Sequence, residues 1–225
     1  KQVVNFQVAT ITSDNMTLQC TPMPSVSQFS QAEIEAATEI VNHQFSAILE
    51  YNHLVSKIRQ FMRNAAVDGD GCIYVWFDPT IENGQLVKGE IVTEVIENTR
   101  VHFGNPNCRD VQAQPYIILS RRELVEDVKY RAEKYKEADL FGMENVDEIT
   151  PDSEKFQNRY DSYTDDKVTV LTYFYKDRDT NTLWCCEATE KGILRKAYNT
   201  GYTRYPLVWL SWDYIPDCYH GQAMI

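Results

Sequence analysis

Few of the residues that could support chemistry occur in the pattern that a known kind of site requires. The turn Asp68-Gly69-Asp70-Gly71 has alternating carboxylates, as at the start of an EF-hand calcium loop. A hydrophobic strand follows it, where the later ligands and the terminal Glu of such a loop should stand. A phosphate-binding loop needs a strand before its glycines and a helix after them, and here that order is reversed. We therefore expect a helix-to-strand turn, in which Gly and Asp are common.

The cysteines and histidines are a second set of candidates. Cys218 and His220 form a C-x-H pair, with His102 as a further ligand, but structural zinc uses four ligands, usually in paired short spacings. Cys185 and Cys186 are adjacent, and on a strand they point to opposite faces. A Cys–His nucleophile couple can still be assembled in space. A Cys/His- or zinc-dependent hydrolase stays open as an alternative, but we assign no catalytic, metal or cofactor-binding residue and expect no cofactor.

The composition limits the classes of partner. The formal net charge of −11 over 225 residues argues against tight binding of free nucleic acid, which rewards clustered Lys and Arg. Six irregularly spaced cysteines in a long chain favour reduced thiols over a disulfide scaffold. No apolar run approaches the roughly 18 residues that span a bilayer, and no signal peptide is visible, so we expect no membrane partner.

Both ends of the sequence are typical of an excerpt. The first residue is Lys1 rather than Met, and an apolar pattern begins almost at once. The last four residues, Gln222 to Ile225, resemble the start of an element more than a frayed polar tail. We expect further sequence on at least the C-terminal side.

The N-terminal third is predicted to be mainly helical. We expect a short helix over residues 3–14 and a short strand over residues 16–20. A capping box of Ser30 and Glu33 then starts one helix of about nine turns, at roughly 3.6 residues each, that ends at Asp68. Helical spacing is carried by Val4, Val8, Ile11, Ile34, Ala37, Val41, Phe45, Ile48, Val55, Ile58 and Met62.

The rest of the chain alternates strands with one charged helix. A hairpin is predicted over residues 72–97, with its turn at Glu82-Asn83-Gly84. A charged helix over residues 121–139 follows a capping box of Ser120 and Glu123. An acidic loop over residues 140–166, irregular or holding a short helix, comes next. The remaining strands are expected at residues 115–119, 167–176, 182–188, 192–197 and 206–212.

These elements predict an α+β class in a single module over residues 1–225, with a long helix, antiparallel or mixed β-hairpins and a second charged helix. A helix of that length is more typical of a frame element or an oligomer strut than of a small core. The fourteen Tyr and four Trp form either core or a subunit interface. His43 and His53 are expected on the polar face of the helix or at an interface.

Three segments occur in an order and spacing that carry a family resemblance. Residues 63–79 join the long helix to a strand and read RNAAVDGDGCIYVWFDP. Residues 95–118 contain VIENTRVHFGNP and then DVQAQPYII. Residues 205–223 begin YPLVWLSW and end DCYHGQA, with Asp217-Cys218 where Ser/Asn-type loop residues are usual. In this combination the sequence resembles the portal proteins of tailed bacteriophages and related prophages.

The resemblance implies a structural role in a virion. Portal proteins form a homo-oligomeric ring, typically of twelve subunits, at one vertex of the viral capsid. Double-stranded DNA passes through this head-to-tail connector during packaging and genome ejection without sequence-specific binding, and the ring contacts terminase, capsid and tail-connector proteins. The excerpt would be the N-terminal wing region without stem, clip and crown, and residues 219–222 would lead toward a stem helix.

The resemblance also implies a location for the protein, and one alternative kind of ring protein stays open. The protein would reside at the portal vertex of the virion, and in the host cytoplasm during assembly, and the family has no catalytic residues to carry over. Another virion or secretion-ring adaptor built from the same α+β parts stays open.

Overall fold

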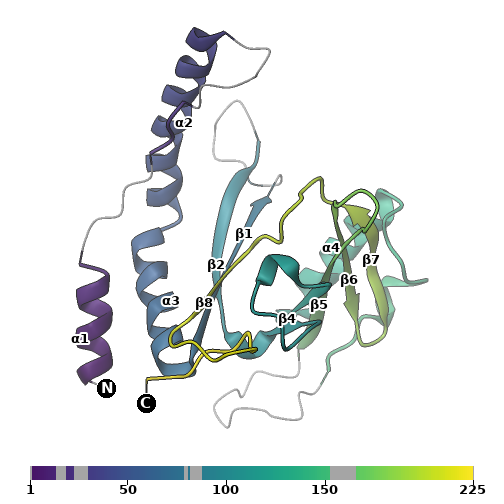
Figure 1. The fold of residues 1–225 in the computed structure, drawn as a ribbon. Coiled ribbons are helices and arrows are strands. Elements are labelled where there is room, and N and C mark those ends of the chain that lie inside the picture. Colours follow the sequence, from purple (N-terminus) through teal and green to yellow (C-terminus); the bar gives the residue numbers. More distant parts are fainter. Residues whose placement is uncertain are drawn as a thin grey trace. The chain divides into compact units, whose positions relative to one another are not determined.

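The computed structural model describes residues 2–13, 19–22, 30–78, 81, 88–152 and 166–224 (Figure 1). It confirms the α+β class, since helices accompany two antiparallel sheets. The chain divides into two compact units, of which unit 1 contains residues 1–96, 206–215 and 220–225 and unit 2 contains the remainder. The single module over residues 1–225 stays a prediction.

Unit 1 begins with helices, as the apolar spacing predicts. α1 (Gln2–Ile11) buries Val4 and Val8, which pack with Ala66 of α3 (Leu54–Asp68). Between these two helices in the sequence comes α2 (Gln31–Tyr51), which begins at the predicted capping box of Ser30 and Glu33. Both halves of that box form, so the backbone N–H groups at this helix start are satisfied locally. The strand predicted for residues 16–20 lies mostly outside the described residues.

The prediction of one helix from Ser30 to Asp68 is wrong, because the chain leaves helical geometry at Asn52 and His53. His53 has a φ of 50°, in the left-handed region. The buried Asn52 side chain donates to the carbonyl of Ile91 at 2.8 Å and accepts from the N–H of Thr93 at 2.8 Å. These bonds fasten the end of α2 to a strand about forty positions later, which helical periodicity alone cannot anticipate.

The sheet of unit 1 has the strand order β2-β1-β8. β1 (Asp70–Asp78) pairs antiparallel with β2 (Glu90–Ile96), which confirms the hairpin; its turn at residues 82–84 lies outside the described residues. β8 (Leu207–Ser211), predicted as the last strand, pairs with the other edge of β1. Burial along β1 is less complete than the apolar sequence indicates, since Phe77 is 47% exposed.

Unit 2 is built on a five-stranded antiparallel meander in chain order. Its core lies between the sheet and α4 (Val125–Glu137), where Val128 and Ala132 of the helix pack with Val168 and Val170 of β5. The three strands predicted at residues 167–176, 182–188 and 192–197 are confirmed as a meander, and the last of them extends to Asn199. The five strands are β3 (Val101–Phe103), β4 (Tyr116–Leu124), β5 (Lys167–Lys176), β6 (Leu183–Thr189) and β7 (Gly192–Asn199).

The predicted helix over residues 121–139 starts too early. Residues 120–124 continue β4 and pair with residues 167–171 of β5, so α4 begins only at Val125. The capping box of Ser120 and Glu123 is therefore wrong, and the residue before α4, Leu124, makes no side-chain cap. Sheet pairing satisfies the backbone groups of these residues, and this long-range pairing outweighs the local cap signal.

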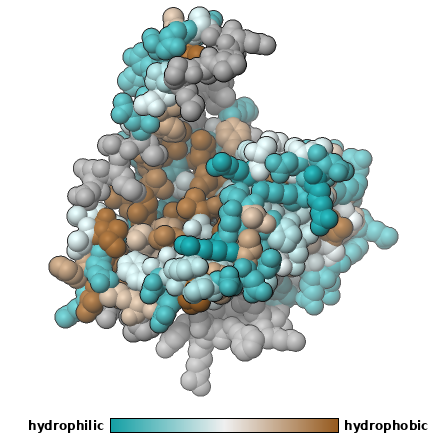
Figure 2. Space-filling view, viewed as in Figure 1, coloured by the Kyte–Doolittle hydropathy of each residue, from teal (hydrophilic) through white to brown (hydrophobic). Residues whose placement is uncertain are grey.

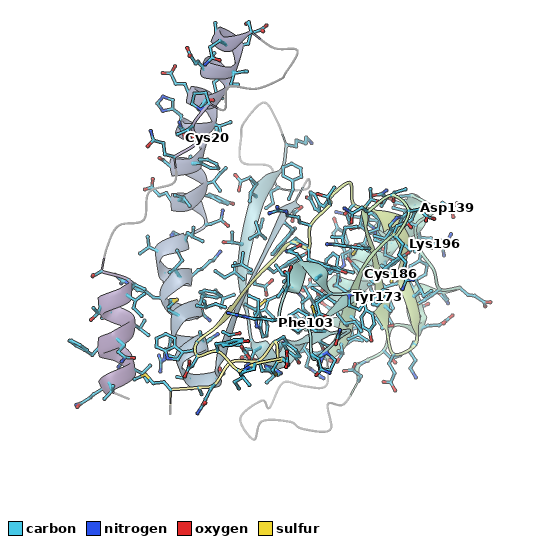
Figure 3. All side chains as sticks on the ribbon, in the orientation of Figure 1. Cys20, Phe103, Asp139, Tyr173, Cys186 and Lys196 are labelled. Carbon is cyan, nitrogen blue, oxygen red and sulfur yellow. The ribbon has the colours of Figure 1, made fainter. Side chains whose placement is uncertain are left out.

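The described part of the acidic loop, residues 140–152, is fastened to unit 2. Lys196 of β7 forms an ion pair with Asp139 at 3.2 Å, and both residues are labelled in Figure 3. Phe141 and Ile149 are buried in the core around α4. A short 3-10 helix, η3 (Val146–Glu148), matches the alternative of a loop that holds a short helix. The rest of the predicted loop, residues 153–165, lies outside the described residues.

Two further 3-10 turns lie in unit 2: η1 (Asn98–Arg100) leads into β3, and η2 (Val111–Ala113) lies between β3 and β4. Of the helices described, each falls short of the length or the apolar character that a bilayer span requires.

We expect Gly69→Ala to destabilise the chain more than Gly201→Ala. Both glycines have a positive φ, at 89° and 75°, so each alanine adds backbone strain of about 1 kcal/mol. At Gly69 a Cβ would also lie 2.4 Å from the carbonyl oxygen of Gly221, whereas at Gly201 nothing lies within 4 Å. Urea unfolding should show a loss of about 2–3 kcal/mol for Gly69→Ala. Equal losses in the two variants would contradict this close backbone approach.

Candidate functional site

A buried carboxylate lies where α3 turns into β1. Asp70 has no exposed surface, and its Oδ1 accepts the backbone N–H of Gly221 at 2.8 Å. Its Oδ2 lies 2.5 Å from Nδ1 of His220, whose side chain is 46% exposed. The two side chains are 150 positions apart in the sequence, so only the fold brings them together.

Backbone contacts around this carboxylate fix the C-terminal segment on the end of α3. The N–H of Trp212 donates to the carbonyl of Gly69 at 2.8 Å, and the N–H of Met224 donates to the carbonyl of Ala66 at 3.0 Å. Gly221 is packed so closely that a Cβ on it would lie 2.6 Å from the carbonyl oxygen of Gly69. We call the four residues Gly69, Asp70, His220 and Gly221 the C-terminal clamp.

The contacts of the C-terminal clamp can be compared with two roles, one catalytic and one structural. A histidine hydrogen-bonded to a buried carboxylate is the base-and-orienter part of a catalytic triad, which requires a nucleophile as its third member. The ring of Trp209 lies 6.3 Å from the His220 ring, centroid to centroid. The second oxygen of Asp70 accepts a backbone N–H, and this bond holds residue 221 in place whether or not His220 is charged. The contacts therefore favour a structural clamp.

The residues considered for a calcium loop form a turn instead. Gly69 is the C-cap of α3, and its N–H donates to the carbonyl of Ala65 at 3.0 Å. Asp70 and Gly71 already belong to β1. Within the described residues, no group of three or more His, Cys, Asp or Glu side chains is arranged to hold a metal ion.

All six cysteines are described, and all are free thiols. Burial raises the pKa of Cys72 and of Cys185 to about 12, which suppresses the thiolate and makes both poor nucleophiles at neutral pH. Cys186, labelled in Figure 3, is only half-buried and stands opposite Tyr173 of β5. Cys185 is buried where Cys186 is not, as expected for neighbours on opposite faces of a strand.

The other histidines singled out in the sequence are exposed. His43 lies on the surface of α2, His53 at the break between α2 and α3, and His102 on β3. For His43 this agrees with a position on the polar face of a helix, whereas His53 lies outside both helices, in the break between them.

A partly buried polar network in unit 2 was not anticipated from the sequence. The hydroxyl of Tyr135 lies 3.2 Å and 3.3 Å from the two carboxylate oxygens of Glu187. Arg131 contacts the carboxylate of Glu123 at 2.8 Å and that of Glu187 at 3.7 Å. The guanidinium of Arg195 stacks over the ring of Tyr135 at 5.0 Å. The one signal in the sequence was Tyr135, which marks the apolar side of a charged helix.

This network shifts the acidity of its phenol. Burial, followed by the negative charge of Glu187, raises the pKa of Tyr135 from its ordinary value of 10.0 to about 12. Burial likewise raises the pKa of Tyr198, whose ring lies 3.5 Å from the guanidinium of Arg195. The neutral phenol of Tyr135 stays a hydrogen-bond donor to the carboxylate of Glu187. Because Tyr135 lies on α4 and Glu187 on β6, this bond holds the helix on the sheet.

Comparison with known proteins assigns no family. No protein-family model matches the sequence, and a search of curated proteins found no match.

We expect Asp70→Ala to loosen the C-terminal segment. The change leaves the N–H of Gly221 and the ring of His220 without their acceptor, which costs about 1–3 kcal/mol for a buried group. Hydrogen exchange should show faster exchange of the amides in residues 219–224. Asp70→Asn keeps one oxygen acceptor and should be milder, and Asp179→Ala in an exposed turn should change nothing there. Unchanged exchange in Asp70→Ala would show that the segment is held by other contacts.

We expect alkaline pH to weaken the chain partly through Tyr135. The unfolded chain releases this phenol proton near pH 10, whereas the folded protein keeps it until about pH 12. The stability that Tyr135 contributes is therefore complete below pH 10 and is lost as pH rises toward 12. Urea unfolding at a series of pH values should give a shallower decline for Tyr135→Phe than for the wild type. Identical declines would contradict the raised pKa.

Proposed function

We propose that this chain is part of a structural subunit of a phage portal, the ring through which double-stranded DNA is packaged and ejected. The starting point is the resemblance of residues 63–79, 95–118 and 205–223, in that order, to portal proteins. The observation that carries the proposal is the C-terminal clamp. It joins Asp70 of the first segment to His220 and Gly221 of the third.

The clamp supports the proposal because its contacts explain why particular residues are required in two of the resembling segments. A helix, a Gly-Asp turn and a strand are common parts when taken singly. Here Gly69 and Gly221 are required by one close backbone approach, and Asp70 and His220 by one hydrogen bond. Two of the three resembling segments therefore depend on each other in space, and this is better support than three independent matches.

Unpartnered helix surface is a second support, because a ring subunit must bind its neighbours. None of the residues of α2 is buried, although the helix is 21 residues long. Isolated helices are only marginally stable in water, and most helices in proteins rely on tertiary packing. Large apolar side chains on the helices of unit 1 are also exposed, among them Phe6 at 73%, Ile40 at 63% and Val55 at 62%.

The charge of the chain is compatible with a conduit. DNA that slides through a ring must not be gripped by its phosphates, and a chain with a net charge of −11 offers little counterion release. Under this proposal the partners are further copies of the chain, terminase, the capsid and tail connectors, and the location is the portal vertex of the virion.

The oligomeric state of the complete protein tests the proposal. Mass photometry and negative-stain electron microscopy should show closed rings of about a dozen subunits. A circular dichroism spectrum with both helix and strand signals serves as the control for folding. A complete protein that is folded and remains monomeric at high concentration would rule the portal out. Another virion ring adaptor would also form rings, and a long helix directly after residue 225 would favour the portal.

A hydrolase is the second candidate, and the pairing of Asp70 with His220 is the observation that favours it. Its nucleophile would be Cys218, two residues before the histidine, and a zinc-dependent variant would need bound metal. Elemental analysis of the purified protein and activity on ester substrates would decide the matter. Loss of activity in Cys218→Ser would support the hydrolase, and rings that assemble normally in that variant would support the portal.

A further inference from the structure

The two longest helices of unit 1 differ in the sign of their charge. α2 carries four glutamates and neither Lys nor Arg. α3 carries three basic residues and a single acid, Asp68, at its last position. The residues are Glu33, Glu35, Glu39 and Glu50 on α2, and Lys57, Arg59 and Arg63 on α3.

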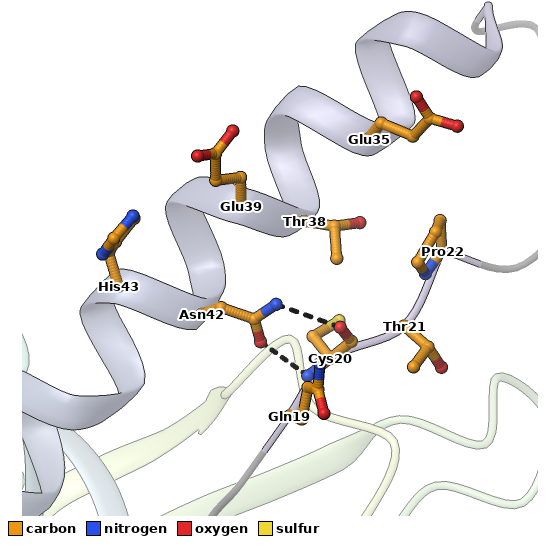
Figure 4. A pocket seen from close by; sticks show the side chains of 9 residues that line it. All are labelled: Gln19, Cys20, Thr21, Pro22, Glu35, Thr38, Glu39, Asn42 and His43. Carbon is orange, nitrogen blue, oxygen red and sulfur yellow. Dashed lines mark hydrogen bonds between the residues drawn. The ribbon is translucent and has the colours of Figure 1, made fainter.

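Two of the glutamates form an acidic pair on one side of α2. Glu35 and Glu39 are four positions apart, are both exposed, and line one pocket together with residues 19–22 (Figure 4). That segment is fastened to the helix at a different residue, because Asn42 accepts from the N–H of Cys20 at 2.6 Å and donates to its carbonyl at 3.1 Å. Hydrophilic residues predominate on the visible surface of this end of α2 in Figure 2.

A basic cleft lies between α1 and α3. Arg59 and Arg63 line it together with uncharged residues of α1, including Asn5, and with Thr12 just after that helix, and its volume is about 480 Å³. Both arginines are exposed, and α1 has no charged residue in its whole length. The third basic residue of α3, Lys57, is used elsewhere, since its ammonium donates to the carbonyl of Thr93 at 2.5 Å.

The acidic pair and the basic cleft match each other in spacing as well as in charge. Residues four apart on a helix are about 6 Å apart along its axis. The backbones of Glu35 and Glu39 therefore have the same axial spacing as those of Arg59 and Arg63, so two carboxylates of one surface can each reach one guanidinium of the other. Carboxylate–guanidinium pairs are among the stronger charge-assisted hydrogen bonds, and their fork geometry fixes register.

The two surfaces do not meet within one copy. Glu39 and Arg59 are twenty positions apart, which corresponds to about 30 Å along consecutive helices. Figure 1 shows α2 continuing away from the end of α3 rather than folding back along it. The acidic pair of one chain can therefore reach a basic cleft only on another copy.

We propose that Glu35 and Glu39 of one copy dock in the cleft lined by Arg59 and Arg63 of the next copy. This contact rests on the proposed ring function and names the surfaces that ring neighbours would use. It is heterologous, because the acidic pair on one copy meets a different surface on the other, so each added copy leaves one surface of each kind unused. Such a contact propagates until the rotation closes a ring. The exposed Ile40 and Val55 lie on the same helices and add apolar area.

Charge reversal in the complete protein tests this contact. One variant carries Glu35→Lys and Glu39→Lys, and the other carries Arg59→Glu and Arg63→Glu. Each variant alone opposes like charges at every contact, so mass photometry should show assembly weakened by at least about tenfold. In an equimolar mixture, opposite charges are restored at every contact where the two variants alternate, so the mixture should assemble again. As a matched control, Glu133→Lys with Glu137→Lys reverses two exposed charges four positions apart on α4 and should assemble like the wild type.

The outcomes separate this contact from the ring proposal itself. Rings that form equally well in both reversed variants overturn the contact and leave the portal proposal standing. Variants that fail singly and also fail when mixed overturn the direct pairing. A wild-type protein that stays monomeric overturns both proposals. A wild-type dimer that is lost in each variant and restored by mixing supports the contact and overturns the ring.

Discussion

The buried carboxylate of Asp70 is the constraint on which the architecture of unit 1 depends. Burial of an ionisable group is costly unless hydrogen bonds compensate it, and here both oxygens are used, one by the backbone of Gly221 and one by the ring of His220. Those partners come from the last residues described, so the end of the chain is drawn onto the turn between α3 and β1. Glycine is needed at positions 69 and 221 because their backbones approach too closely for a side chain.

Unit 2 is stabilised in a different way. Its meander pairs neighbours in sequence, so most of its register follows from local hairpins. The helix α4 is then fixed by a buried core around Val128 and by the polar network of Tyr135, Arg131 and Glu187. A network of partly buried polar groups of this kind rigidifies a fold, because loss of one partner leaves another polar group without its hydrogen bond or its counter-charge.

The two units also differ in how much of their surface their own residues cover. α4 buries Val128 and Ala132, whereas α2 buries nothing. The acidic pair on α2 and the basic cleft beside α3 are complementary surfaces that one copy cannot join. These surfaces, with the exposed apolar residues on the same helices, are the ones that the proposed contact between copies would use.

The sequence by itself determined the features that depend on near neighbours. The capping box of Ser30 and Glu33, the meander of strands over residues 167–197 and the turn at Gly69 could all be predicted, because their hydrogen bonds join residues close in the chain. The tertiary structure decided the rest. α2 ends at Asn52 because of Thr93, and residues 120–124 are a strand because of β5. Asp70 and His220 were each visible in the sequence, but their pairing spans 150 residues and depends on a burial that no local pattern encodes.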